Sequence, residues 1–92
     1  MVGTLIKAEI DEDEIDGVFI CDIKDVIMSE GETQYLVYVF PPDKLEDMFL
    51  DPDEIHDWDR EALEDLFDEV INVLKNKNAF IISASQILKF EA

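Results

Sequence analysis

Carboxylates are the side chains whose spacing in this sequence could do chemistry. Between positions 53 and 69 they recur every three or four residues, which would place them on one face of an α-helix. The row comprises Asp53, Asp57, Glu61, Glu64 and Asp68, with Asp65 and Glu69 beside it. Like charges at this spacing cost a helix about 0.2–0.5 kcal/mol per pair, and only Arg60 intervenes. A row that weakens its own helix is a candidate surface for a cationic partner; the alternative is a solvated outer face.

The spacing of this row also suggests what it could imitate. Successive carboxylates would rise about 4.5–6 Å along the helix axis. A DNA strand carries one phosphate per ~3.4 Å of axis, which is the same order of distance. The row therefore predicts a nucleic-acid mimic that occupies the basic groove of a DNA- or RNA-binding protein. The predicted contact residues are Asp53, Asp57, Glu61, Glu64, Asp65 and Asp68.

Residues with catalytic potential are few. The single histidine, His56, lies among acids, and no serine, threonine or cysteine near it has the context of a nucleophile. The single cysteine, Cys21, ends an apolar run from Val18, which predicts a buried and inert thiol. Among 24 acids, paired carboxylates arise by chance, and histidine and cysteine are too scarce for a zinc site. We therefore expect that this protein is not an enzyme and that it has no metal site and no cofactor.

Net charge narrows the class of partner. The 24 acids and 7 bases give a formal charge of −17. Direct binding to nucleic acid requires lysine and arginine to displace counterions, and an anionic membrane would repel this chain. Cations and basic protein surfaces are the partners that remain. In charge and size the chain resembles the small acidic inhibitors of phages and mobile elements and the immunity proteins of nuclease toxins.

Two functions follow from these observations. The first is a non-enzymatic acidic binding protein that inhibits or regulates a basic, nucleic-acid-binding protein by mimicry. The second is a structural or assembly adaptor that binds through an apolar sheet edge, with the charge serving solubility. The start of the chain lacks a signal-peptide pattern and no apolar run is long enough to span a bilayer, so we expect a cytoplasmic monomer or small homo-oligomer.

The elements that must position these residues belong to one domain of 92 residues. Alternating apolar residues predict strands over residues 2–10, 18–28, 35–40 and 79–84. The Asp16-Gly17 pair predicts a hairpin turn, and residues 29–33 predict a second turn. Residues 85–90 either extend the last strand or turn into a short fifth one. The aromatic residues Tyr35, Tyr38, Phe40 and Trp58 are expected in the core, and an interface hot spot is the alternative.

The helix between the third and fourth strands has two possible starts. Asp51 is a candidate N-cap before Pro52, which predicts a continuous helix to residues 75–77. A break near residues 57–59, with Asp59 as a new N-cap, is the open alternative. The predicted fold class is α+β, in the order β-β-β-α-β. Its small antiparallel sheet is curled, or forms a partly open barrel, and carries one long acidic helix.

Overall fold

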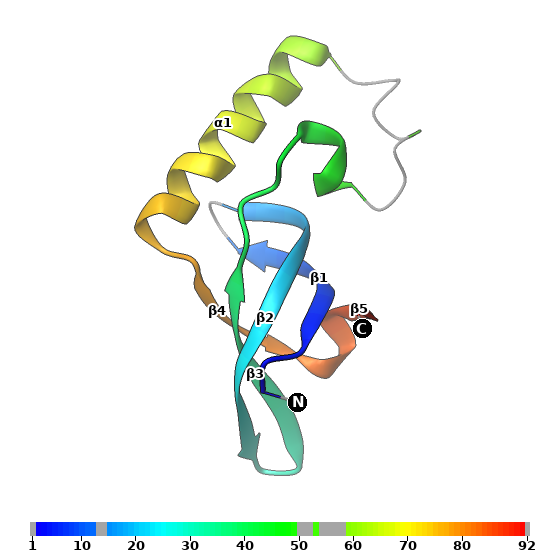
Figure 1. Ribbon diagram of the computed structural model, residues 1–92, viewed down its shortest axis with the longest axis vertical. Coiled ribbons are helices and arrows are strands. Elements are labelled where there is room, and N and C mark those ends of the chain that lie inside the picture. Colours follow the sequence, from blue (N-terminus) through cyan, green and yellow to red (C-terminus); the bar gives the residue numbers. More distant parts are fainter. Residues whose placement is uncertain (1, 13–14, 50–52, 54–58, 92) are drawn as a thin grey trace.

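The computed structural model describes residues 2–12, 15–49, 53 and 59–91 (Figure 1). Its elements are β1 (Leu5–Glu12), β2 (Ile15–Ser29), β3 (Glu32–Val39), the 3₁₀ helix η1 (Leu45–Met48), α1 (Arg60–Asn76), β4 (Ala79–Ser83), the 3₁₀ helix η3 (Ala84–Gln86) and β5 (Ile87–Glu91). The five strands form one antiparallel sheet in the order β4-β3-β2-β1-β5. The α+β prediction is confirmed, and the sheet is open.

The first hairpin differs from its prediction. Glu12 pairs with Ile15, so Asp16 and Gly17 lie inside β2 and the turn prediction at that pair is wrong. Gly17 serves another purpose there. A Cβ at Gly17 would lie 3.1 Å from the backbone oxygen of Met48 and 3.3 Å from the ring of Phe19. Glycine therefore lets the backbone of η1 approach β2 closely.

The second hairpin follows its prediction. Ser29 pairs with Glu32, and the two residues between them, Glu30 and Gly31, both have positive φ, at 45° and 80°. A two-residue turn of this kind matches the twist of the strands that it joins. The β2–β3 hairpin extends away from the helices and forms one end of the molecule (Figure 1).

A fifth strand is present, so the second of the two predictions for residues 85–90 is confirmed. β4 and β5 are the two edges of the sheet, yet only the three residues of η3 join them. Gln86 closes this corner: its Nε2 donates to the backbone oxygen of Glu9 at 2.8 Å, and its Oε1 accepts from the amide of Ser83 at 3.0 Å. The sheet is therefore strongly curled.

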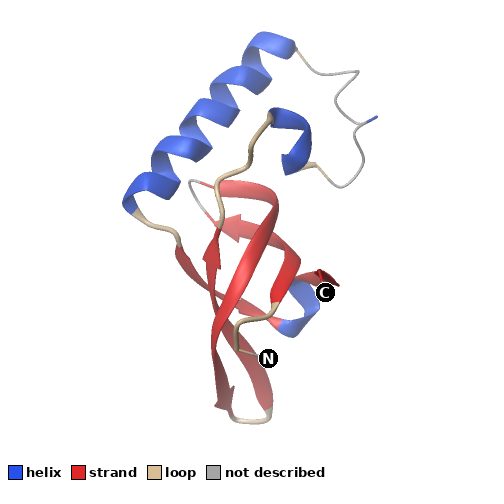
Figure 2. Cartoon of the chain, viewed as in Figure 1, coloured by secondary structure: helices blue, strands red, loops and turns tan. Residues whose placement is uncertain are grey.

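One hydrophobic core lies between the concave face of the sheet and the helices. Alternate residues of the strands, such as Ile6, Cys21 and Val37, are fully buried. α1 contributes Leu63, Val70 and Leu74, and η1 contributes Leu45 and Met48. Figure 2 shows α1 and η1 together at one end of the sheet. None of the helices in the described ranges has the length and apolar character needed to cross a membrane.

Asp59 sets the start of α1. Its backbone is extended, with φ −65° and ψ 119°, and its side chain accepts a hydrogen bond from the amide of Glu61 at 3.0 Å. The prediction of one continuous helix through residues 57–59 is therefore wrong, and the alternative start at Asp59 is confirmed. The carboxylate satisfies an N–H that has no carbonyl partner in the first turn, which makes this position a stable helix end. The predicted start at Asp51 and Pro52 lies outside the described residues.

Candidate functional site

The outer face of α1 carries most of the predicted contact residues. Leu63, Val70 and Leu74 face the core, so the acids between them point to solvent. The exposed acids of α1 are Glu61, Glu64, Asp65, Asp68 and Glu69. They span eight residue steps, or about 12 Å of helix axis. The structure therefore brings Glu61, Glu64, Asp65 and Asp68 together, as the sequence predicts.

The remainder of the predicted row is not on this helix. Asp53 is exposed and lies outside α1, before its N-cap at Asp59. Asp57 lies outside the described residues. The prediction that one helical row runs from Asp53 to Asp68 is thus wrong, because the extended backbone of Asp59 interrupts the helix.

Arg60 neutralises only part of this acidic face. Its Nη1 contacts Oε1 of Glu46 in η1 at 3.1 Å, and its Nε lies 3.5 Å from Oε1 of Glu64. The pKa of Glu46 is held below its usual value by its own backbone N–H and by the Arg60 guanidinium. Within the described ranges, no cation lies at ion-pair distance from Glu61, Asp65, Asp68 or Glu69. Most of the charge on α1 is therefore free to meet a partner.

The acidic surface continues from α1 onto the first hairpin. A hollow of about 580 Å³ separates them, and Glu12 of β1 and Glu69 of α1 both line it. The proximity of these two residues could not be predicted from the sequence, since 57 positions separate them and no local pattern links them. Only the packing of α1 beside β1 brings Glu12 and Glu69 to one surface.

Metal-ligand clusters and reactive nucleophiles were looked for among the residues that the structure describes. Within the described ranges, no group of three histidine, cysteine, aspartate or glutamate side chains could hold a metal. Cys21 is fully buried, and burial raises the pKa of its thiol to about 12. The thiol thus stays protonated near neutral pH, and the predicted core position is confirmed. His56 lies outside the described residues.

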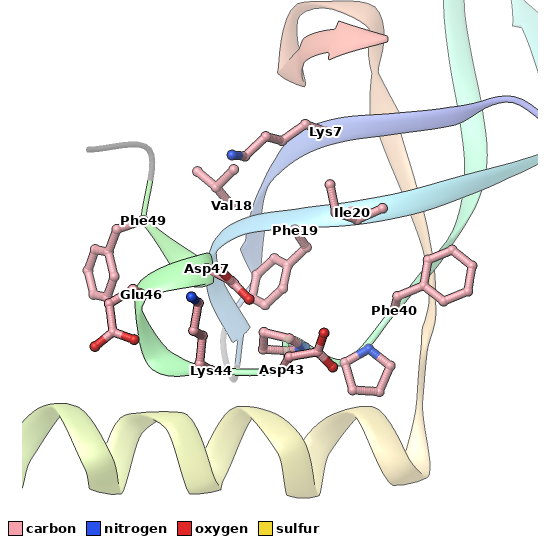
Figure 3. Close-up of a pocket in the computed structure, with 12 residues that line it drawn as sticks. Lys7, Val18, Phe19, Ile20, Phe40, Asp43, Lys44, Glu46, Asp47 and Phe49 are labelled. Atoms are coloured by element: carbon pink, nitrogen blue, oxygen red, sulfur yellow. The ribbon is translucent and has the colours of Figure 1, made fainter. Parts of the chain in front are cut away.

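A second and larger hollow, of about 720 Å³, lies on the convex side of the sheet (Figure 3). The segment that follows β3 forms one wall, and the outward side chains of β1 and β2 form the other. Its lining residues are Lys7, Val18, Phe19, Ile20, Phe40, Pro41, Pro42, Asp43, Lys44, Glu46, Asp47 and Phe49. No short sequence pattern predicts this hollow, because it depends on the path of residues 40–49 over the sheet.

Apolar side chains continue from this hollow across the convex face. Phe40 is 47% exposed and Tyr38 is 41% exposed, so their predicted core positions are wrong. Tyr35, on the concave side, does pack against the core, and Trp58 lies outside the described residues. The amide of Phe40 donates to the backbone oxygen of Ile20 at 2.9 Å, which places Phe40 next to an outward residue of β2. Lys24 lies 5.3 Å from the Tyr38 ring centroid and covers part of this face.

Comparison of the chain with protein-family models, with curated proteins and with solved structures gives no match. What the chain does must therefore be inferred from its own surface.

Proposed function

We propose that this chain is a non-enzymatic acidic binding protein that inhibits or regulates a basic, nucleic-acid-binding protein by occupying its groove. The observation that carries the proposal is the outer face of α1. Five acids crowd about 12 Å of this helix, and Arg60 is the one cation that reaches any of them among the described residues. A surface that only needed solubility would gain stability from lysines at alternate positions.

The arrangement of the acids in two groups supports the same function. A nucleic-acid duplex presents two rows of phosphates with a groove between them. Here Glu69 of α1 and Glu12 of β1 both line the 580 Å³ hollow, with Lys77 as the lysine of its lining. A basic protein could thus meet negative charge on both sides of a recess. The net charge of −17 would also speed its diffusional approach.

The first test asks whether the captured partner also binds nucleic acid at the same site. The immobilised chain is exposed to a cell lysate, and the retained proteins are then challenged with duplex DNA, duplex RNA or polyglutamate at equal total charge. Mimicry predicts release by one of the nucleic acids at concentrations where polyglutamate has little effect. Equal release by all three polyanions would mean that only net charge attracts the partner, and the proposal would fail.

The second test locates the contact on α1. Asp65→Asn with Asp68→Asn should slow association with the captured partner about tenfold and flatten its salt dependence, because steering charges act mainly on the association rate. The same pair should leave the free energy of unfolding unchanged or higher, since it relieves repulsion in the helix. Surface plasmon resonance and urea denaturation measure the two effects.

A matched control removes the same charge from the other end of the molecule. Glu30→Gln with Glu32→Gln changes exposed acids at the tip of the β2–β3 hairpin. This variant should bind nearly as the unmodified chain does. If both pairs slow association equally, the geometry of α1 is irrelevant and mimicry is wrong.

The adaptor function is favoured by a different observation. The edge strands β4 and β5 expose Ile81 and Phe90, which are 53% and 52% accessible. An apolar edge can pair with a strand of a partner protein. In that case Ile81→Ser and Phe90→Ser would abolish capture at high salt, while the α1 variants would leave it intact.

A further inference from the structure

β4 is an edge strand without the features that usually protect an edge. Natural sheets protect their edges with charged side chains, proline or a bulge, because an open edge pairs readily with another strand. β5, at the opposite edge, has Lys89 and Glu91 among its five residues, and its pairing with β1 contains a register shift. β4 has the sequence Ala-Phe-Ile-Ile-Ser and pairs with β3 in unbroken register. In a chain of 24 acids and 7 bases, this edge is uncharged.

The uncharged edge belongs to the longest stretch of the chain without an acid. Residues 70–90 contain no aspartate or glutamate. The acids of α1 end at Glu69, and the last turn of the helix, which leads toward β4, contains Lys75. In Figure 1, β4 runs beside β3 from the end of α1 to η3. Two copies of the chain can therefore meet at β4 without placing the acidic faces of their α1 helices against each other.

The backbone of β4 turns four hydrogen-bonding groups away from the sheet. The amide of Val39 donates to the backbone oxygen of Asn78 at 2.8 Å, so Asn78 faces β3. In an antiparallel ladder, residues alternate between those that bond to the neighbouring strand and those that do not. Phe80 and Ile82 thus also face β3, while the N–H and C=O groups of Ala79 and Ile81 point to the open edge. No described residue forms a hydrogen bond with these four groups.

Apolar side chains accompany these groups on the convex face. Ala79 stands opposite Tyr38 of β3, so the two share a face, and Ile81 follows on the same face two residues later. Ile81 is 53% exposed and Tyr38 is 41% exposed. A strand added beside β4 would cover part of this surface and remove it from water.

We propose that β4 pairs with β4 of a second copy of the chain, antiparallel and about a two-fold axis beside Phe80. In this register Ala79 of each copy stands opposite Ile81 of the other, so all the outward N–H and C=O groups of both residues are paired. The large side chain of Ile81 also lies beside the small side chain of Ala79. A contact between two identical edges closes on itself, which is the usual symmetry of a homodimer.

The dimer should be weak at low salt and tighter at high salt. Each copy carries a charge of −17, and the repulsion between copies opposes association until ions screen it. The Debye length falls from about 30 Å at about 0.01 M salt to about 3 Å at about 1 M. Sedimentation equilibrium of the full chain at these two NaCl concentrations should show a species of twice the chain mass, with a Kd that falls roughly tenfold or more.

Amide hydrogen exchange locates the contact on β4. The amides of Ala79 and Ile81 face solvent in a single copy, whereas those of Phe80 and Ile82 are bonded to β3. In high salt, a protein concentration about ten times the Kd should slow exchange at Ala79 and Ile81 roughly fivefold, as mass action requires. Exchange at Phe80 and Ile82 should change little. This measurement uses the unmodified chain, so it does not depend on the folding of any variant.

Variants of the edge give a second measurement. Ile81→Asp places a charge on the edge and should raise the dimer Kd more than tenfold. Ile81→Pro should do the same, because it removes an outward N–H and leaves the bonds to β3 in place. The matched control is Leu88→Asp, which adds the same charge to β5 at a residue that is 39% exposed. This control should dimerise as the unmodified chain does. Circular dichroism checks that each variant is folded.

Four results would overturn the proposal. The chain could remain a monomer in high salt at every concentration, or a dimer could form without slower exchange at Ala79 and Ile81. Leu88→Asp could weaken the dimer as strongly as Ile81→Asp. Assemblies larger than a dimer would also contradict it, because they require a pairing that does not close after two copies, such as β4 with β5.

The dimer extends the proposed function and does not depend on it. Ile81→Asp should still be bound by a basic partner of the acidic face of α1. Asp65→Asn with Asp68→Asn should bind that partner more slowly and still dimerise in high salt. The two variants therefore distinguish a failure of the dimer from a failure of the proposed function.

Discussion

Asp59 is the residue that determines which acids share a face of α1. Its carboxylate caps the helix through the amide of Glu61, and its extended backbone separates α1 from the acids that precede it. Glu61 follows in the first turn, where a negative charge complements the helix dipole. The cap and this first-turn charge together fix the helix start at Arg60.

Asp59→Ala should therefore lower the free energy of unfolding by about 0.5–2 kcal/mol, the usual cost of losing an N-cap. Asp59→Asn should cost much less, because asparagine caps nearly as well as aspartate. Urea denaturation of both variants, read by far-ultraviolet circular dichroism, measures the difference. Equal stability of the alanine and asparagine variants would contradict the role of this cap.

Gly17 shows why residue patterns can mislead. Asp-Gly between apolar residues is a strong turn signal, and the sequence offers it at Asp16 and Gly17. In the structure, the glycine is instead required by the backbone of Met48, which a Cβ would approach to 3.1 Å. That requirement comes from a segment 31 positions later in the chain, so no local pattern could reveal it.

At the scale of elements, sequence patterns correctly predicted the features that depend on neighbouring residues, namely strands, the second turn and the grouping of acids on α1. The alternation of apolar residues placed the strands, and Glu30-Gly31 marked the turn between β2 and β3. Asp51 and Asp59 were both plausible N-caps from the sequence, and the structure shows that α1 begins after Asp59. The acids Glu61, Glu64, Asp65 and Asp68 could be predicted as a group, because helical spacing alone brings them together.

The covering of the sheet could not be predicted in this way. Alternation separates two faces of a strand but does not say which face a distant segment covers. Tyr38 and Phe40 have the composition of core residues, yet they lie on the convex side, which remains partly exposed. The hollow beside them depends on the route of residues 40–49, and its lysines come from β1 and from that route.

At the scale of the molecule, charge repels charge across the whole domain. Its extents are 42 × 27 × 23 Å, which is comparable to the Debye length of about 30 Å at 0.01 M salt. At low ionic strength nearly every acid therefore interacts with the others. Repulsion of this kind destabilises the compact state relative to the unfolded chain.

Salt should consequently stabilise this protein. Raising NaCl from about 0.01 M to about 0.15 M shortens the Debye length to about 8 Å and should raise the Tm by several degrees. A variant that combines the two neutralised pairs, at Asp65 and Asp68 and at Glu30 and Glu32, should gain less from the same salt. Thermal melts followed by circular dichroism test this, and a Tm that falls or stays constant with salt would refute it.

The pairing of β5 with β1 also shapes the time course of folding. Leu5 lies opposite Glu91, so this ladder closes a loop that contains almost every other element. Loop-closure entropy opposes so distant a contact until the chain between is already ordered. We therefore expect the β2–β3 hairpin to form early and β5 to dock after the rate-limiting step.

Stopped-flow measurements should show that Ile87→Ala, in β5, accelerates unfolding and leaves the refolding rate nearly unchanged. A clearly slower refolding rate would place β5 in the folding nucleus. The hydrogen bond from Gln86 to the backbone oxygen of Glu9 is thus expected to form late in folding, when the rest of the sheet has assembled.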